Sequence, residues 1–426
     1  MLDDWHDTVA PGAARHRRRE QLSPARNPFK GLAAFEEPDA ADFYGRTEPI
    51  DALVGALTQR NFVALVGPSG MGKSSVIHAG LLPALRAGAI PGSENWITAT
   101  TTPGPRPFEQ LASALQRVAA HAQPGLEHDL AVHPEQAATA ADGLLPGDTH
   151  LLIVVDQLEE LFTLTPDPAV RAAYLSVLAA LAAPDRRVSI VVGIRADFFD
   201  RPLEYGTFGD LLRAGTVPLT LPDADELAEI IRRPAEAVGV TTEPGLVDLI
   251  CDEVRSQPGG LPLLEYALTD LFEHRTADVI TFEDYQASGG MPGALGRRAE
   301  ALYQSFDPQS QDVTRRLFLS LVAVADAAPD LRRRVRRSEL DRLDIDREAL
   351  DDVIARFAAA RLITLDRDPL TRGPTVEVAH EALFGAWSRL ASWIDAHRED
   401  LLQYRRLSSA FTEWQESGEE TAFLLT

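Results

Sequence analysis

Lysine and cysteine are both scarce in this chain of 426 residues. Cys251 is the single cysteine, which excludes an intramolecular disulfide framework and indicates a reducing compartment. No apolar run is long enough to cross a bilayer, and charged residues occupy the N-terminus, where a signal peptide needs an apolar stretch. We therefore expect a cytoplasmic protein with no membrane partner.

Basic residues are outnumbered by acidic ones, 41 against 64, which gives a formal net charge of −23. Such a charge disfavours nucleic acid or an anionic membrane as a partner of the protein as a whole. Hydrophobic residues make up 45% of the chain and charged residues 25%, as in ordinary globular proteins. The length is sufficient for several domains, each with its own core.

Only two lysines occur, Lys30 and Lys73, and the second stands in a complete P-loop sequence of the form G-x-x-x-x-G-K-[ST]. The apolar run 62–66 before the loop is typical of a buried parallel strand, and residues 75–85 after it are typical of a helix. In a P-loop, main-chain N–H groups and a helix N-terminus surround a polyphosphate, the lysine contacts its β- and γ-phosphates, and the following hydroxyl ligates Mg²⁺. The sequence therefore predicts a nucleotide site formed by Gly67, Pro68, Ser69, Gly70, Met71, Gly72, Lys73, Ser74 and Ser75.

The first half of the chain alternates between apolar strands and helices. Residues 1–26 are polar and contain a basic run, which is typical of a flexible arm. Residues 27–221 contain strand candidates separated by helical stretches, at 62–66, 96–100, 151–155, 189–194 and 217–219. This alternation predicts an α/β fold, a P-loop NTPase core with a parallel sheet and helices on both faces.

The rest of the chain is predicted to be mostly helical. In residues 222–306 the strand pattern stops, and Asp223 with Glu226 has the spacing of a capping box, so we expect a helical subdomain. In residues 307–385 two helices flank a basic segment and precede two short strands, the order of a winged-helix domain. Residues 386–426 begin with large apolar side chains at helical spacing, which predicts a C-terminal amphipathic helical arm.

Two further strands end in residues that suit a nucleotide site. The run 151–155 is followed by Asp156, the Walker B arrangement, which places a Mg²⁺ ligand beside the P-loop. Glu159 and Glu160 come next, and the sequence does not decide which of them orients or deprotonates an attacking water. The run 189–194 ends in Arg195, whose guanidinium can contact a γ-phosphate. The candidate catalytic residues are Lys73, Asp156, Glu159, Glu160 and Arg195, and the candidate metal ligands are Ser74 and Asp156.

Several motifs occur in a fixed order along the chain: FYGR at 43–46, the P-loop continuing into HAGLLPAL at 78–85, VDQLEELF at 155–162, GIRAD at 193–197, GGLPLL at 259–264 and VAHEAL at 378–383. Together they resemble the STAND class of signal-transduction ATPases, and more narrowly the bacterial novel STAND group. The resemblance covers about residues 27–407, nearly the whole chain after the basic arm.

The resemblance implies roles for residues outside the P-loop. Gly45 and Arg46 would lie near the adenine and its ribose, and Pro262 would pack on the nucleotide. His380 would contact the β-phosphate of ADP and hold a closed state. STAND proteins usually carry a sensor array or an effector domain, and this chain has neither. We therefore expect a protein partner, either as a separate chain or in a further part of a longer one.

The leading hypothesis is a nucleotide-dependent switch that binds and slowly hydrolyses ATP with Mg²⁺ in bacterial signalling or defence. Its ADP-bound form would be closed, and its ATP-bound form would be open and able to form a homo-oligomer. The alternative is a DNA-associated ATPase that uses the winged helix and the arginines of 332–337, although acidic residues such as Glu339 and Asp341 lie close to them. A third hypothesis is a scaffold that binds nucleotide without hydrolysis, which the intact Asp156 and carboxylate pair disfavour.

Overall fold

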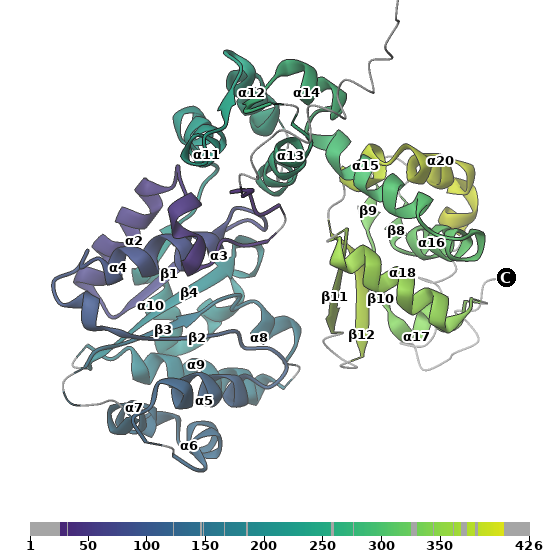
Figure 1. Cartoon of the computed structure of the whole chain (residues 1–426). Helices are drawn as coiled ribbons and strands as arrows, with labels where there is room; N and C mark the ends of the chain where they lie inside the picture. Colours follow the sequence, from purple (N-terminus) through teal and green to yellow (C-terminus); the bar gives the residue numbers. More distant parts are fainter. Residues whose placement is uncertain are drawn as a thin grey trace, which may run out of the picture. The chain divides into compact units, whose positions relative to one another are not determined.

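The computed structural model describes residues 26–403, except 32, 122, 145–146, 148, 166, 185, 257–259, 276, 325–329, 344, 361, 368–372 and 380–381. The chain divides into an N-terminal unit, residues 1–287, and a C-terminal unit, residues 288–426 (Figure 1). The predicted arm at 1–26, apart from Arg26, and the end of the predicted C-terminal arm lie outside the described residues.

A five-stranded parallel sheet forms the centre of the N-terminal unit, with the strand order β2-β3-β4-β1-β5. The strands are β1 (Phe62–Gly67), β2 (Ile97–Thr101), β3 (Leu151–Val155), β4 (Val188–Arg195) and β5 (Thr216–Pro218). The predicted strands and the parallel sheet are therefore confirmed, with small shifts at the strand ends. Because all strands run in one direction, the P-loop after β1, Asp156 after β3 and Arg195 at the end of β4 share one edge of the sheet.

Helices cover both faces of this sheet (Figure 1). Leu151, Ile153 and Val155 of β3 belong to the core on one face, whereas Leu152 and Val154 belong to the core on the other. The side chains of a strand point alternately to its two faces, so a strand buried on both sides must be apolar throughout, as β3 is. The first face is covered by α5 (Pro107–Val118), α6 (Leu126–Val132), α7 (Ala137–Leu144), α9 (Pro168–Leu181) and α10 (Gly206–Gly215), and the second by α2 (Thr47–Gln59) and the helix after the P-loop.

The helix after the P-loop is interrupted by a π-helical segment. It consists of α3 (Lys73–Ser75), the π segment Val76–Leu81 and α4 (Leu82–Arg86). The N–H of Leu82 donates to the carbonyl of Ile77, five residues back, which is the π pattern. Pro83 follows at once and has no N–H to donate, so the i to i−4 ladder is also broken there. The predicted helix at 75–85 is confirmed, but the sequence pattern did not reveal the π segment.

The helical subdomain completes the N-terminal unit. Its helices are α11 (Ala224–Ala237), α12 (Leu246–Ser256), α13 (Gly260–His274) and α14 (Phe282–Ala287). The predicted capping box is confirmed, because the side chains of Asp223 and Glu226 each accept a hydrogen bond from the other's main-chain N–H, at 2.9 and 3.1 Å. The prediction that strands stop after Leu221 was wrong in one detail. Strands β6 (Thr241–Thr242) and β7 (Val279–Ile280) pair in parallel, and at two residues each they are too short to give an alternating pattern.

The C-terminal unit combines helices with short antiparallel strands. Its strands are β8 (Val322–Ala323), β9 (Leu331–Arg332), β10 (Val335–Arg336), β11 (Ile363–Arg367) and β12 (Pro374–Val378). They form the pair β8–β9 and a sheet of order β10-β12-β11, in which β11 and β12 are the two predicted short strands and pair in antiparallel fashion. Its helices are α15 (Gly290–Gln304), α16 (Pro308–Ser320), α17 (Arg337–Leu340), α18 (Arg347–Ala359), α19 (Ala382–Ala386) and α20 (Ser388–Ala396). The assignment of this unit to the winged-helix class stays a prediction.

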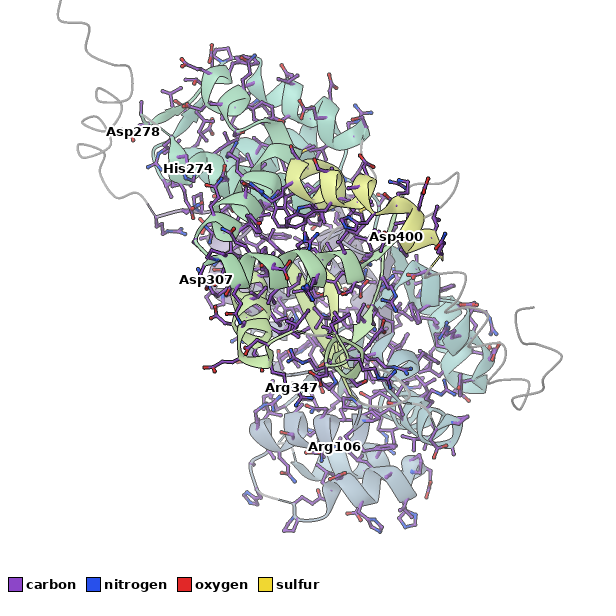
Figure 2. All side chains as sticks on the ribbon, turned by 90° about the vertical axis from the view of Figure 1, so that its right-hand side faces the viewer. Arg106, His274, Asp278, Asp307, Arg347 and Asp400 are labelled. Atoms are coloured by element: carbon purple, nitrogen blue, oxygen red, sulfur yellow. The ribbon has the colours of Figure 1, made fainter. Side chains whose placement is uncertain are left out.

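Aspartates begin two helices of this unit. Asp307, labelled in Figure 2, accepts hydrogen bonds from the main-chain N–H groups of Gln309 and Ser310 at 2.9 and 3.1 Å. Asp346 does the same for Ala349 at 2.8 Å, at the start of α18. Side-chain acceptors at these positions satisfy N–H groups that have no partner within the first turn, so the two helix starts follow directly from the local sequence.

An aromatic cluster forms the core of the C-terminal unit and includes α15. The ring of Trp387, 1% exposed, contacts those of Tyr303, Phe318 and Phe357. A Cβ on Gly296 in α15 would lie 2.0 Å from the carbonyl oxygen of Ala386, so only glycine permits this approach of α15 to α19. The predicted helical subdomain, residues 222–306, includes the residues of α15. The structure instead packs α15 in the C-terminal unit, through contacts that local spacing does not reveal.

Glu300 links α15 to α20 and supplies a test of this packing. Its carboxylate accepts hydrogen bonds from Arg389 at 2.6–3.2 Å and from Trp387 Nε1 at 2.8 Å. The hydrogen bonds from Arg389 lower the pKa of Glu300 to about 2. We expect Glu300→Gln to lower the free energy of unfolding of this unit by about 2 kcal/mol at pH 7. Urea denaturation followed by tryptophan fluorescence measures this difference.

The pH dependence of the free energy of unfolding tests whether Glu300 stabilises the unit through its charge. Because the folded pKa of Glu300 is depressed, its stabilisation is complete above the pKa of the unfolded chain, near 4.5, and is lost as the pH falls toward about 2. The difference between wild type and Glu300→Gln should therefore shrink over that window. Glu399→Gln changes an exposed carboxylate and is the matched control. A difference of equal size at pH 7 and pH 2 would show that Glu300 does not act through its charge.

Candidate active site

The P-loop borders a cavity of about 390 Å³ in the N-terminal unit. Residues 69–75 line it, and Gly70 and Gly72 adopt φ angles of 78° and 82°, in the left-handed region that favours glycine. Gly67 and Pro68 are not among the lining residues. Their carbonyl oxygens accept hydrogen bonds from Lys73 Nζ, each at 2.9 Å, and these bonds fix the start of the loop to the lysine side chain.

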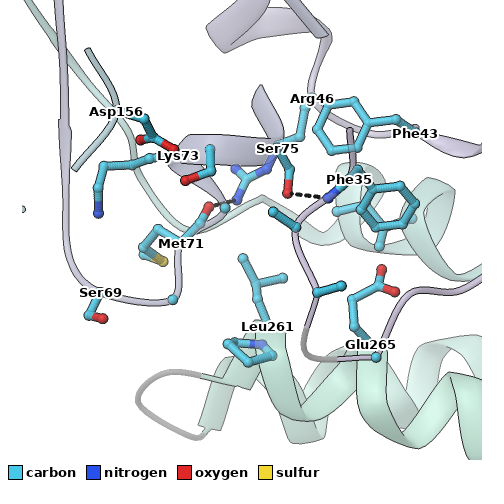
Figure 3. A pocket seen from close by; sticks show the side chains of 18 of the residues that line it. Phe35, Phe43, Arg46, Ser69, Met71, Lys73, Ser75, Asp156, Leu261 and Glu265 are labelled. Atoms are coloured by element: carbon cyan, nitrogen blue, oxygen red, sulfur yellow. Dashed lines mark hydrogen bonds between the residues drawn. The ribbon is translucent and has the colours of Figure 1, made fainter. Parts of the chain in front are cut away.

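Lys73 is the buried cation of the cavity, with 9% of its surface exposed. Burial lowers its pKa, while the negative charge of Glu159 acts in the opposite direction. An ammonium group has three N–H donors, and the two hydrogen bonds to the loop account for two of them. The third is available for a ligand in the cavity. Ser74 lines the cavity next to Lys73, and Ser75 Oγ accepts a hydrogen bond of 3.0 Å from the N–H of Phe35 (Figure 3).

Asp156 is held rigidly at the end of β3. It is 5% exposed, and its Oδ1 accepts a 2.9 Å hydrogen bond from the N–H of Gln157. Gln157 has φ 54°, the only positive φ of a non-glycine residue within the part of the chain that the structure describes. Such strained backbone occurs often at functional sites, where the surroundings hold it in place. A Cβ on Gly193 of β4 would lie 2.7 Å from Asp156 Oδ1, so glycine at that position gives the carboxylate its room.

His78, in the π segment, faces the same carboxylate. Its Nε2 lies 3.6 Å from Asp156 Oδ2. Burial lowers the pKa of His78, but the hydrogen bond and negative charge of Asp156 outweigh this effect, and the net pKa is raised. His78 is not among the site residues that the sequence predicts.

The structure separates the two glutamates that the sequence left undecided. Glu159 lines the cavity, and its Oε2 accepts a 3.2 Å hydrogen bond from the N–H of Arg195. Burial raises its pKa, and Lys73 and Arg195 oppose that change. Glu160 is not among the lining residues, and its Oε2 accepts a 3.1 Å hydrogen bond from the N–H of Gly104 in the loop after β2. Glu159 is therefore the glutamate that lines the cavity, and Glu160 joins the start of α8 (Glu160–Thr163) to the loop after β2.

Arg195 also lines the cavity, and Asp197 orients its guanidinium. Nε and one terminal nitrogen of Arg195 donate to the two carboxylate oxygens of Asp197 at 3.0 and 2.8 Å. Lys73 and Arg195 line the cavity as cations, together with the carboxylates of Asp156 and Glu159. In Figure 3, Lys73 and Asp156 lie on one side of the pocket.

Arg46 and Gly45 take different positions relative to the cavity. Arg46 lines it and is 5% exposed, and it donates to the carbonyl oxygens of Thr220 at 3.0 Å and of Met71 at 2.9 Å. Burial lowers its pKa to about 10. Gly45 is not among the lining residues: with φ 67°, it packs against α11, where a Cβ would lie 2.3 Å from the carbonyl oxygen of Glu226. Arg46 thus holds the P-loop to the end of the sheet, and Gly45 permits the close approach of α11.

Pro262 brings the helical subdomain to the P-loop. A Cβ on Gly70 would lie 3.0 Å from Pro262 Cγ, and Pro262 lines the cavity together with Leu261 and Glu265 of α13. The sequence analysis missed the aromatic residues Phe35, Phe43 and Tyr44, and it missed Ile230, Pro234 and Glu265, all of which line the same cavity. One signal pointed to Glu265, which follows Pro262 by three residues and therefore shares a helix face with it.

The residues described include no cluster of three or more His, Cys, Asp or Glu side chains that would hold a metal ion unaided. The Ser74 hydroxyl and the Asp156 carboxylate are oxygen ligands that suit Mg²⁺, which keeps several waters and takes further ligands from phosphates. The oxygen donors of the cavity therefore fit Mg²⁺ bound together with a polyphosphate.

His380 lies outside the described residues, so its contact with ADP stays a prediction. Arginines of the basic segment 332–337 pair with acidic side chains of their own unit: Arg332 and Arg334 with Glu377, Arg333 with Glu339, and Arg337 with Asp341 and Asp351. These pairs neutralise positive charge that would otherwise attract a phosphate backbone. Among the described helices, none is both long and apolar enough to cross a membrane.

Comparison with known proteins identifies the family. Residues 28–422 match the family model described as Novel STAND NTPase 1. No curated protein matches the chain. Among solved structures, the Aeropyrum pernix ORC1 protein in complex with DNA is 17% identical, covering 82% of this chain and 93% of its own, with a TM-score of 0.43. A Walker-type ATPase of Pyrococcus abyssi is 13% identical, with coverages of 84% and 100% and a TM-score of 0.41. These TM-scores are low, so the functional conclusion depends on the family match and the geometry of the cavity.

Proposed function

The chain belongs to the Novel STAND NTPase 1 family, and on that premise we propose that the cavity binds ATP with Mg²⁺ and hydrolyses it slowly, as a molecular switch. The observation that carries this proposal is the joint placement of Lys73, Asp156 and Glu159 around one cavity beside the P-loop. Family membership alone supports an NTPase, and the choice of ATP and of a slow turnover is part of the proposal.

Each polar residue of the cavity has a distinct task in this proposal. Lys73 and Arg195 neutralise the β- and γ-phosphates, and the main chain of residues 69–75 surrounds them. Mg²⁺, when bound, offsets the negative charge of the phosphate oxygens, and Ser74 and Asp156 hold it. Glu159 orients the attacking water and takes its proton as the water oxygen bonds to the γ-phosphorus and ADP leaves.

The switch depends on the helical subdomain. Pro262 touches the P-loop at Gly70, so a change of ligand at the loop alters a contact with α13. A nucleotide shifts such an equilibrium only through contacts that differ between the two states. The γ-phosphate, present in ATP and absent in ADP, is the group that makes this difference at Lys73 and Arg195. The proposed latch at His380 stays a prediction.

Small-angle scattering tests the switch. We expect the ADP-bound protein to be monomeric and compact, and the protein with a non-hydrolysable ATP analogue to show a larger radius of gyration or a higher mass, because only the analogue places a γ-phosphate between Lys73 and Arg195. Lys73→Ala should show no such difference. Identical scattering with saturating ADP and analogue would contradict the switch while leaving nucleotide binding intact.

The biological setting is a further part of the proposal. We place the switch in bacterial signalling or defence, with a protein sensor or effector as its partner, on the strength of the family resemblance. DNA is a weaker candidate, because Arg332, Arg333, Arg334 and Arg337 already have acidic partners within their unit.

A further inference from the structure

The cavity has a charged end and an apolar end. Lys73, Asp156 and Ser69 lie on one side of the pocket in Figure 3, and Phe35, Phe43 and Glu265 lie on the other. Ile230, Pro234 and Leu261 add further apolar lining. If the polyphosphate occupies the P-loop, the base of the nucleotide extends into the apolar end, where aromatic and aliphatic side chains can cover its faces.

Glu265 is the carboxyl group at this apolar end. It is half-buried, and its Oε2 accepts one long hydrogen bond, 3.4 Å, from the main-chain N–H of Lys30. The charged groups around it are engaged elsewhere. The ammonium of Lys30 pairs with Asp39, Arg26 pairs with Asp42 at 2.8 Å, and Arg46 donates to main-chain carbonyls. None of the contacts within the described residues gives Glu265 a cationic partner.

The surroundings favour the neutral form of this carboxyl group over the carboxylate. Burial raises the pKa of Glu265 to about 7, and the N–H of Lys30 only partly offsets this. A neutral carboxylic acid has one donor and one acceptor side by side, whereas a carboxylate has acceptors alone. The edge of adenine that carries its amino group presents one donor next to one acceptor ring nitrogen, which complements the neutral acid. Guanine presents two adjacent N–H donors, which complement the carboxylate.

We propose that Glu265 hydrogen-bonds the edge of the nucleotide base and selects adenine over guanine. This inference rests on the proposed nucleotide binding and names the residue that recognises the base. The placement of Glu265 at the apolar end of the cavity, three residues after Pro262 on the same helix, is what carries it. Glu265 touches no phosphate in this arrangement and is therefore a specificity residue.

Binding of ATP and GTP to the full chain at pH 6.0 and pH 8.5, measured by calorimetry, tests the inference. In the wild type the preference for ATP over GTP should fall by about 5-fold or more as the pH rises through the pKa of Glu265, because the adenine-binding protonated form is lost. The ratio of the two affinities cancels the titration of the phosphates, which both nucleotides share. Glu265→Gln keeps a donor and an acceptor, so its preference should be independent of pH.

Two variants complete the test. Glu265→Leu removes both hydrogen bonds and should reduce the preference for ATP by about 5- to 150-fold at pH 6.0. Glu273→Gln changes an exposed carboxylate on the same helix and should match the wild type.

An ATP-to-GTP ratio that is unchanged in Glu265→Leu and constant with pH in the wild type would overturn the inference. The inference would also be overturned if Glu265→Leu changed the ratio of the affinities for ATP and 2′-deoxy-ATP but left the ratio for ATP and GTP unchanged. That result would assign Glu265 to the ribose. Loss of all nucleotide binding in the wild type would instead contradict the proposed function.

Discussion

Replacing Lys73 with alanine is expected to weaken ATP and ADP binding by about 100-fold or more. The ammonium is buried, it anchors the P-loop through Gly67 and Pro68, and Lys73 lines the cavity. Hydrogen bonds to charged groups contribute roughly 1.5–3 kcal/mol each, and removal of this residue takes away a phosphate contact and the support of the loop together. Isothermal titration calorimetry with MgADP and MgATP measures the loss.

The chain offers a matched control, since Lys30 is the only other lysine. Its side chain pairs with Asp39 and is 33% exposed, so Lys30→Ala removes the same charge at a different place. We expect this variant to bind nucleotide within about threefold of wild type, because an exposed ion pair contributes little. Equal nucleotide affinity of Lys73→Ala and wild type would contradict the proposed binding site, regardless of the affinity of Lys30→Ala.

Replacing Glu159 with glutamine is expected to slow ATP hydrolysis by about 100- to 10,000-fold while leaving the ATP affinity within about threefold of wild type. The amide keeps an acceptor for the N–H of Arg195 but cannot take a proton from water. Burial raises the pKa of Glu159. As the pH is lowered, the wild-type hydrolysis rate should therefore begin to fall at a higher pH than it would with an ordinary glutamate base. Single-turnover hydrolysis across pH measures both effects.

Glu160→Gln is the paired control for this experiment. Its side chain accepts from the N–H of Gly104, and a glutamine oxygen accepts the same hydrogen bond. Hydrolysis should therefore stay within about threefold of wild type. If Glu160→Gln were the slow variant and Glu159→Gln the normal one, the assignment of the base would be reversed. If both hydrolysed ATP at the wild-type rate, the base would lie elsewhere in the cavity.

Much of the nucleotide site was predictable because its signals are local. A run of apolar residues ending at Val66 or Val155 indicates a strand buried on both faces, and the residue that follows it must lie at the carboxyl edge of the sheet. The P-loop glycines and Lys73 belong to one short stretch of chain. Asp223 and Glu226 cap a helix within a single turn, and that prediction was confirmed for the same reason.

Other features escaped the sequence analysis because they depend on contacts between distant residues. Glu159 and Glu160 are neighbours of equal chemistry, and only the position of the loop at Gly104 separates them. Glu265 reaches the cavity because α13 folds against the P-loop through Pro262, and the aromatic segment before α2 reaches it through the bond from Phe35 to Ser75. The association of α15 with the C-terminal unit follows from the absence of a side chain at Gly296.

The sequence by itself therefore determined that this protein has a parallel α/β core with a P-loop and a following acidic strand end, because periodic apolar runs and adjacent polar residues encode both. The tertiary structure alone decided which glutamate faces the cavity, which helix covers its apolar end and where the two units divide. These outcomes depend on close packing between segments far apart in the chain, where a missing Cβ at Gly70 or Gly296 sets the approach of two backbones.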